Sequence, residues 1–280
     1  MPISPIAASL VLDTHLHLYR VYEVAATLQH ARRNLLQLAQ GLGLARPIPA
    51  ACLTERADHN VFDELKKGRR SLEPAFDIRV PAESAALLLH TPEDADPMIL
   101  LAGRQMVTAE NIEVLGLVME DLVPDGLPLE DTIARVRERG GIPVLSWAPG
   151  KWFFGRGRRV RETVARARPG ELLLGDTSLR PWGWREPRIM RAARRRGLGV
   201  VAGSDPLPFA EDAVYAGRMA TVFGPAPFDI QRPASEIIRR LVGIAPLHRR
   251  AGLRLSPFSV FVRIMRNRAC KTKPPARVPA

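Results

Sequence analysis

Short apolar runs of strand length alternate with longer segments of helical period along most of the chain. This alternation is typical of an α/β fold whose strands form a mainly parallel sheet. Seven runs have the length and composition of buried strands, at residues 9–13, 50–54, 98–102, 112–117, 142–146, 172–175 and 199–203. Seven βα units in a chain of 280 residues favour a closed or nearly closed barrel over an open sheet.

Three segments carry the pattern of amphipathic helices. Residues 22–40 repeat apolar side chains at helical spacing, residues 128–139 begin at a proline and end before a glycine pair, and residues 235–242 form a last helix. The region 69–109 is less regular. Its two short apolar runs are either another βα unit or an antiparallel insertion.

Composition places the chain among globular proteins. It is 46% hydrophobic and 25% charged, which excludes a disordered or fibrous chain. Two cysteines are too few for a disulfide framework, and the N-terminus lacks the pattern of a signal peptide, so we expect a cytoplasmic protein. Because no apolar run approaches the roughly 20 residues that cross a bilayer, we do not expect an integral membrane protein.

The net charge of +12 comes almost entirely from the C-terminal end. Glu236 is the last acidic residue, and eleven basic residues follow it: Arg239, Arg240, Arg249, Arg250, Arg254, Arg263, Arg266, Arg268, Lys271, Lys273 and Arg277. A segment of one sign can bind a polyanion, either nucleic acid or an anionic membrane surface, although a solvated tail explains the same residues. Residues 256–268 are expected to form an amphipathic surface helix, and residues 271–275 to be disordered.

The most informative motif ends the first predicted strand. His15 and His17 lie two residues apart, so on an extended backbone both imidazoles point to the same side and can bind one metal ion. The adjacent Asp13 makes simple packing a poorer explanation of the pair. Imidazole suits zinc, iron and manganese alike.

A second motif ends the last predicted strand. Gly203, Ser204 and Asp205 follow a buried apolar run and place a carboxylate where that strand meets its loop. Asp205 is predicted either to complete the metal site or to act as a base toward a metal-bound water. The alternative is a turn or capping role before Pro206.

Together the two motifs resemble the PHP superfamily, named for polymerase-associated and histidinol-phosphatase domains. Segments 112–117, 124–133 and 140–145 are similar to the family's strand, helix and glycine-pair strand in the same order. The resemblance spans about residues 9–215 and implies a metal-dependent phosphoesterase on a distorted (β/α)7 TIM-like barrel.

From this resemblance and the charge pattern we expect two parts. Residues 1–243 would form the PHP-like α/β barrel, and residues 244–280 a basic, partly disordered C-terminal extension. The implied partners are a small anionic substrate for the barrel and a polyanion for the extension.

Several positions depart from the family pattern. Glu55 stands where an aspartate is usual, Gln105 replaces the usual metal-bridging glutamate, Trp147 replaces a histidine, and the histidine expected after Asp205 is absent. A neutral amide holds two cations weakly and tryptophan ligates none, so we expect one ion rather than three.

The resulting hypothesis is a site for one divalent metal, either zinc, manganese or iron. Its predicted ligands are His15, His17 and Asp205, with Glu55 or Asp176. Arg180 follows Asp176 by four residues and is predicted to clamp an anion, although an internal pair that fixes the loop is the alternative. Aromatic side chains in the same loops could floor a ligand pocket or simply pack: Trp147, Trp152, Phe153, Phe154, Trp182 and Trp184.

Three functions remain open on the sequence. The first is a metal-dependent phosphoesterase that uses a metal-activated water, with Asp205 and Arg180 as catalytic residues. The second is an amidohydrolase-type barrel, and the third is a catalytically degenerate barrel that binds a ligand or partner.

Overall fold

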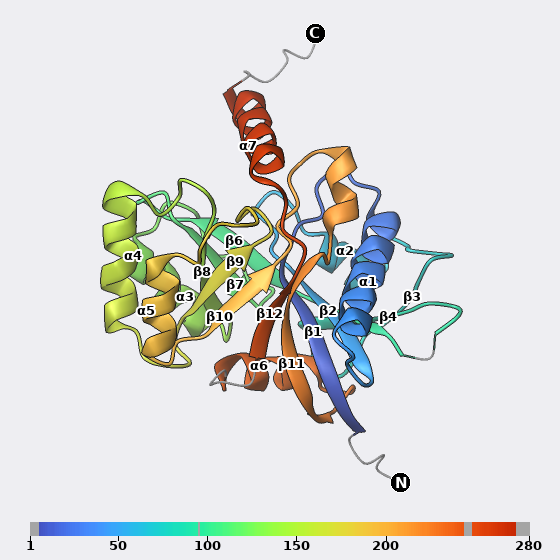
Figure 1. Ribbon diagram of the computed structural model, residues 1–280. Coiled ribbons are helices and arrows are strands. Elements are labelled where there is room, and N and C mark those ends of the chain that lie inside the picture. The colour runs from blue at the N-terminus through green and yellow to red at the C-terminus, as the bar shows by residue number, and fades with distance from the viewer. Residues whose placement is uncertain (1–5, 95, 244–247, 273–280) are drawn as a thin grey trace.

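The computed structural model describes residues 6–94, 96–243 and 248–272. In this part of the chain helices and strands form a mixed α/β fold, as the alternating pattern predicts, with the strands in two sheets (Figure 1). The first sheet runs in the order β12 (His248–Gly252), β11 (Met219–Phe228), β1 (Ile6–Leu16), β2 (Pro47–Leu53), β5 (Met98–Leu101), β4 (Ala86–His90) and β3 (Asp77–Arg79). The second runs in the order β10 (Val200–Gly203), β9 (Leu173–Thr177), β8 (Ile142–Ser146), β7 (Glu113–Leu117) and β6 (Gly103–Val107).

All seven predicted strand runs lie in strands, but the sheets are less parallel than expected. β1, β2 and β5 are parallel, as are β8, β9 and β10, whereas β7 is antiparallel to both β6 and β8. The reason is local: β6 and β7 are joined by a tight turn closed by a bond from the Thr108 N–H to the Ile112 carbonyl, 3.0 Å. A parallel connection needs a crossover of a dozen or more residues. The insertion between residues 69 and 109 is antiparallel, with β4 paired to both β3 and β5.

Two seams bring the sheets together. At one, the Asp205 N–H donates to the His15 carbonyl, 2.8 Å, and joins the end of β10 to β1. At the other, Glu55 bridges Arg104, and its N–H donates to the Gly103 carbonyl, 3.1 Å. Among the described residues the strand ladder does not close into one hydrogen-bonded ring. The closed or nearly closed barrel of the sequence prediction is represented by two sheets that meet at these two seams.

The two sheets nevertheless enclose a common apolar core. Leu12 of β1, Cys52 of β2, Leu117 of β7 and Val201 of β10 belong to one buried cluster. Helix α6 (Pro233–Val242) contributes Ile237 and Leu241 to the same cluster, and both are fully buried. In Figure 1 this helix lies at the lower end of the sheets, near the start of β1. The opposite end, where the parallel strands terminate, is left for polar side chains.

The other helices cover the outer faces of the sheets. The predicted helices 22–40, 128–139 and 235–242 are confirmed as α1, α3 and α6, with ends displaced by one or two residues. Helix α1 packs Leu28 and Leu35 on the first sheet, and α3, α4 and α5 pack on the second. The remaining bounds are α1 (Val24–Gly41), α2 (Val61–Lys66), α3 (Leu129–Glu138), α4 (Phe154–Arg166), α5 (Arg188–Arg195), the 3-10 helix η1 (Ala210–Tyr215) and α7 (Pro257–Thr272). No helix in the described segments is both long and apolar enough to cross a membrane.

The C-terminal extension is part of the fold beyond residue 243, the predicted boundary. β12 adds an antiparallel edge strand to β11, with Met219 opposite Gly252. The predicted surface helix at residues 256–268 is present as α7. Of the segment predicted to be disordered, residues 271 and 272 end α7 and residues 273–275 lie outside the described part of the chain.

A glycine at the β1–β10 seam gives a direct test of this packing. A Cβ at Gly203 would stand 2.3 Å from the His15 backbone nitrogen, a contact that only a backbone shift relieves. We expect Gly203→Ala to lower the free energy of unfolding by roughly 3 kcal/mol, measured by chemical denaturation. Gly224→Ala is the matched control, because a Cβ there meets no atom within 4 Å. Equal stability of the two variants would show that β1 and β10 do not pack as described.

Candidate metal centre

The two histidines of the first strand present their rings to each other. β1 ends at Leu16, with His15 inside it and His17 directly after, and both side chains are buried. Their Nε2 atoms lie 3.0 Å apart, and the ring planes are inclined by 68°. The local period of the strand thus places both imidazoles on one side, as predicted.

Asp205 joins the histidines from the end of β10. Its Oδ1 lies 3.5 Å from the His15 Nε2 and 3.7 Å from the His17 Nε2. The backbone of Asp205 has φ of 47°, a left-handed conformation that aspartate tolerates better than most residues. Because the Asp205 N–H is bonded to the His15 carbonyl, this turn fixes the carboxylate beside the imidazoles.

These three side chains have the geometry of a metal-ligand set. Their ligand atoms lie within 4.8 Å of one another. Within the described part of the chain, this is the one group of three or more His, Cys, Asp or Glu side chains with such a spacing. Zinc and similar ions bind nitrogen and oxygen at about 2.0–2.2 Å, which puts neighbouring ligand atoms roughly 3–3.5 Å apart. Two of the observed spacings, 3.0 and 3.5 Å, lie in that range, and the third, 3.7 Å, is slightly longer.

Burial keeps both imidazoles neutral. It lowers the pKa of His15 to about 4 and that of His17 to about 3, with the nearby Glu113 carboxylate acting in the opposite direction on both. A neutral imidazole has a free lone pair for a metal, whereas an imidazolium has none. At neutral pH the site therefore needs to release no proton from these two side chains before an ion binds.

A surrounding layer of polar groups orients the His15 ring. The Gln105 Oε1 lies 3.1 Å from the His15 Nε2, and the Ser146 Oγ lies 3.4 Å from its Nδ1. Contacts to the second ring nitrogen fix the tilt of a ligating imidazole in metalloproteins. Gln105, which replaces the bridging glutamate of the family pattern, therefore lies in the site as a neutral oxygen donor.

The buried Asp13 carboxylate binds the backbone segments that carry the site. Its Oδ1 accepts from the backbone N–H groups of His15 at 3.0 Å and Ser204 at 2.9 Å, and its Oδ2 accepts from the Gly217 N–H at 3.1 Å and from the Ser204 hydroxyl. Burial raises the pKa of Asp13 to about 6, although these hydrogen bonds oppose the shift. The bond from His15 lies within β1, and the bonds from Ser204 and Gly217 join β1 to the segment between β10 and β11.

Two charged residues at this site were not predicted from the sequence. Glu113 forms an ion pair with Lys151, and both charges affect the pKa values of His15 and His17. Glu113 opens β7, a position that a parallel strand would place at the far end of the barrel. The antiparallel direction of β7 brings it to the end that carries the histidines. Lys151 lies in the loop after β8, and no sequence signal singled it out.

Glu55 is not with the histidines, although the sequence analysis made it a possible ligand. Its Oε1 accepts from the Val61 N–H at 2.6 Å and its Oε2 from the Phe62 N–H at 3.2 Å. Both donors belong to the first turn of α2, whose N–H groups lack partners within the helix. The carboxylate therefore caps α2 and lies outside the three-residue group.

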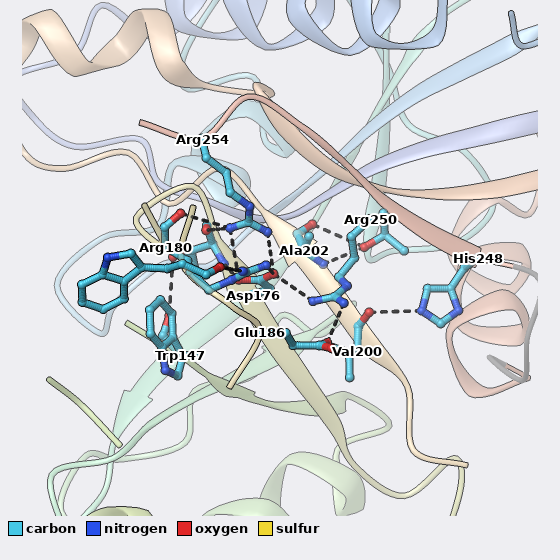
Figure 2. A network of polar contacts seen from close by, with 12 residues as sticks. Trp147, Asp176, Arg180, Glu186, Val200, Ala202, His248, Arg250 and Arg254 are labelled. Atoms are coloured by element: carbon cyan, nitrogen blue, oxygen red, sulfur yellow. Dashed lines mark hydrogen bonds and ion pairs between the residues drawn. The ribbon is translucent and has the colours of Figure 1, made fainter. Parts of the chain in front are cut away.

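Asp176 is also engaged elsewhere. Figure 2 shows three guanidinium groups converging on its carboxylate. Arg180 donates to both oxygens at 2.9 and 2.7 Å, Arg250 donates at 2.8 Å, and Arg254 donates at 2.7 Å. Burial alone would raise the pKa of Asp176, but the arginines outweigh it and lower the pKa. With both oxygens bound by cations, Asp176 is not placed to hold a metal.

The same network occupies Arg180, the predicted anion clamp. Besides Asp176, its guanidinium donates to the Trp184 carbonyl at 2.6 Å. The side chain thus fixes its own loop, which was the alternative interpretation. Two of the three arginines come from the C-terminal extension, so the basic residues there partly serve to attach it.

The aromatic side chains of these loops separate rather than floor one pocket. Trp147 and Trp152 are buried in the cluster beneath α4, whereas Phe154 and Trp182 are exposed. Packing therefore explains Trp147 and Trp152, and Phe154 and Trp182 do not join them in one pocket.

No protein-family model and no curated protein matches the sequence. Among solved structures, PsfC from Pseudomonas syringae superposes with a TM-score of 0.54 at 17% identity, over 94% of this chain and 99% of its own. A two-domain protein from Bacteroides vulgatus that contains a predicted PHP-like metal-dependent phosphoesterase gives 0.50 at 14%, over 95% and 73%. The lesion-specific endonuclease PfuEndoQ from Pyrococcus furiosus gives 0.51 at 10%, over 88% and 59%. The likeness to the PHP superfamily is thereby confirmed at the level of the fold, in a chain of divergent sequence.

The buried arginine network yields a prediction about stability. We expect Asp176→Asn to lower the free energy of unfolding by about 3–5 kcal/mol at pH 7, because three partly buried guanidinium groups lose their anion. Asp77→Asn is the control; it removes the exposed pair with Arg79 and should cost about 1 kcal/mol or less. Urea denaturation of the three proteins measures both.

The difference in the free energy of unfolding between wild type and Asp176→Asn should depend on pH. Because the pKa of Asp176 is lowered on folding, its stabilisation is present above the ordinary value of 3.8 and is lost as the pH falls below it. The gap between wild type and Asp176→Asn should therefore narrow as the pH is lowered through this range. A gap that stays constant, or that widens, would contradict an ionised Asp176 in the fold.

Proposed function

We propose that the protein is a divalent-metal-dependent hydrolase that acts on a phosphoester of a small anionic substrate. The observation that carries the proposal is the buried group of His15, His17 and Asp205, with two Nε2 atoms 3.0 Å apart at the end of the barrel where the parallel strands terminate. In barrels of this kind the chemistry lies at that end.

The donor set fits one ion of the zinc, manganese or iron type. His15 and His17 supply two neutral nitrogens, Asp205 supplies an anionic oxygen, and Gln105 supplies a neutral oxygen within 3.1 Å of the His15 Nε2. Mixed nitrogen and oxygen donors suit these metals better than calcium or magnesium, which prefer oxygen alone. When bound, such an ion supplies a Lewis acid for the phosphoester and a water of lowered pKa.

The remaining roles belong to the chain's own side chains. Asp205 is the carboxylate beside the two imidazoles, and it can accept a proton from water. The charge of Lys151 acts on both histidines and lowers their pKa values, so we assign to Lys151 the anion-binding role first assigned to Arg180. Its ammonium has three donors, and Glu113 leaves some of them for a substrate phosphate. Tyr19 contacts the His17 ring, with centroids 5.0 Å apart, and forms a wall of the site.

A phosphoester is favoured over an amide because of the charges at the site. The cation Lys151 suits a substrate that remains anionic throughout the reaction. Two of the proteins with a similar fold, a predicted PHP-like phosphoesterase and an endonuclease, act on phosphoesters, and both are analogies at low identity. The amidohydrolase alternative usually adds a lysine or histidines on the middle strands, and in the described part of the chain no further histidine joins the three ligands.

The decisive experiment measures metal content and hydrolysis together. We expect the protein, purified without a histidine tag, to hold about one zinc, manganese or iron per chain and to hydrolyse nitrophenyl phosphate esters. The His15→Ala, His17→Ala double variant should lose both properties, because it removes both nitrogen donors. Elemental analysis and the release of nitrophenol give the two readouts.

Two controls make this result specific. His30→Ala removes a histidine far from the site, on α1, and should change neither readout. Glu55→Gln should keep the metal, since this carboxylate caps α2. If wild-type protein takes up none of the three ions even after incubation with each, the hydrolase proposal is wrong, and the degenerate binding protein becomes the better description.

A further inference from the structure

Helix α7 carries opposite kinds of surface on its two faces. Successive residues of a helix are rotated by about 100°, so Phe258, Phe261, Val262 and Met265 lie on one face. All four are exposed; the exposed fractions are 76% for Phe258 and 62% for Phe261. We call these four residues the α7 apolar stripe. The opposite face contains Val260, which is buried.

The inner face of α7 is fixed to the body of the protein. Arg263 forms an ion pair with Asp212 of η1, and its guanidinium lies 4.2 Å from the centre of the Tyr215 ring. Arg266 pairs with Glu211, and its guanidinium lies 4.0 Å from the centre of the Phe209 ring. These contacts hold the helix in one rotation, so the apolar stripe faces away from the protein.

Other exposed apolar side chains lie near the base of the helix. Leu253 is 70% exposed and Trp182 is 63% exposed. The Trp182 N–H donates to the Leu255 carbonyl at 3.0 Å, which attaches the Trp182 loop to the segment just before α7. Solvent-exposed apolar groups that gather in this way mark a contact surface.

From these features we infer that α7 docks the protein on an anionic membrane surface, with the apolar stripe among the acyl chains. The sequence around α7 supplies the charge complementarity: α7 and the residues after it contain Arg263, Arg266, Arg268, Lys271, Lys273 and Arg277 and no acidic residue. A helix with phenylalanine and aliphatic residues on one face and arginine beside them is typical of helices that lie in the membrane interface.

The composition of the stripe favours a lipid surface over the other polyanion, a nucleic acid. Val262 and Met265 are aliphatic and can enter hydrocarbon, but they do not stack on bases as aromatic side chains do. Arg263 is already bound to the buried Asp212 of η1, which withdraws it from the direct phosphate contacts on which nucleic-acid affinity depends. A second copy of the chain is disfavoured because it would bring two strongly basic segments together.

The position of α7 adds an orientation to the inference. In Figure 1 the helix projects from the upper end of the molecule, opposite α6. The Arg268 guanidinium lies next to Gly150, in the same loop as Lys151. α7 and the metal-ligand group therefore lie toward the same end of the molecule. The docking itself does not depend on hydrolysis.

Vesicle co-sedimentation of the full chain tests the inference. We expect the wild type to sediment with vesicles of phosphatidylcholine and phosphatidylserine, to bind pure phosphatidylcholine far more weakly, and to be released as the salt concentration rises. Phe258→Ala with Phe261→Ala should weaken binding about ten-fold or more, because each ring contributes buried apolar area. Val80→Ala with Leu122→Ala removes two exposed apolar side chains from other parts of the surface and should leave binding unchanged.

Four outcomes would overturn the inference. The first is no sedimentation with anionic vesicles under conditions where circular dichroism shows a folded protein. The second is equal binding by the stripe variant and the control variant, which would mean that charge alone attracts the chain. The third is a wild-type dimer in sedimentation velocity that becomes a monomer in the stripe variant, which would assign the stripe to a second copy. Tighter binding to single-stranded DNA than to vesicles, lost in the stripe variant, would assign it to nucleic acid.

Discussion

The candidate site depends on the close approach of β1 and β10. Gly203 has no side chain, so its backbone can lie against that of His15, and the buried Asp13 carboxylate accepts from Ser204 and Gly217 across the gap. These bonds fix the loop after β10 at a set distance from the first strand. Only with that distance fixed does the Asp205 carboxylate lie beside two histidines that come from a segment almost two hundred residues earlier.

Burial has opposite consequences for the ionisable groups at this end of the sheets. It lowers the pKa values of His15 and His17 and so favours the neutral form that binds metals. It would also neutralise Asp176, but three arginines reverse that effect and keep it ionised. Two carboxylates that follow neighbouring strands thus differ in their partners: Asp205 faces neutral imidazoles, whereas Asp176 is surrounded by fixed cations.

The C-terminal extension is bound to the body of the protein and also presents an exposed helix. Arg250 and Arg254 insert into the network around Asp176, and β12 extends the first sheet. The charge that appeared in the sequence as a uniformly basic tail is therefore divided between structural ion pairs and an outward-facing helix. This division places the proposed membrane contact and the candidate metal centre at one end of a single folded unit.

The sequence by itself determined the features that depend on local periodicity. The strand runs, the amphipathic helices and the shared direction of His15 and His17 follow from the two-residue period of a strand and the 3.6-residue period of a helix. Only the tertiary structure decided the partners of isolated charged residues. Glu55 caps a helix, Asp176 binds Arg250 and Arg254, which lie 74 and 78 residues further along, and Glu113 reaches the site because β7 runs antiparallel. The physical reason is that a carboxylate at a strand end is satisfied by whichever donors the fold brings to it, and neither those donors nor the direction of the strand is encoded in its neighbours.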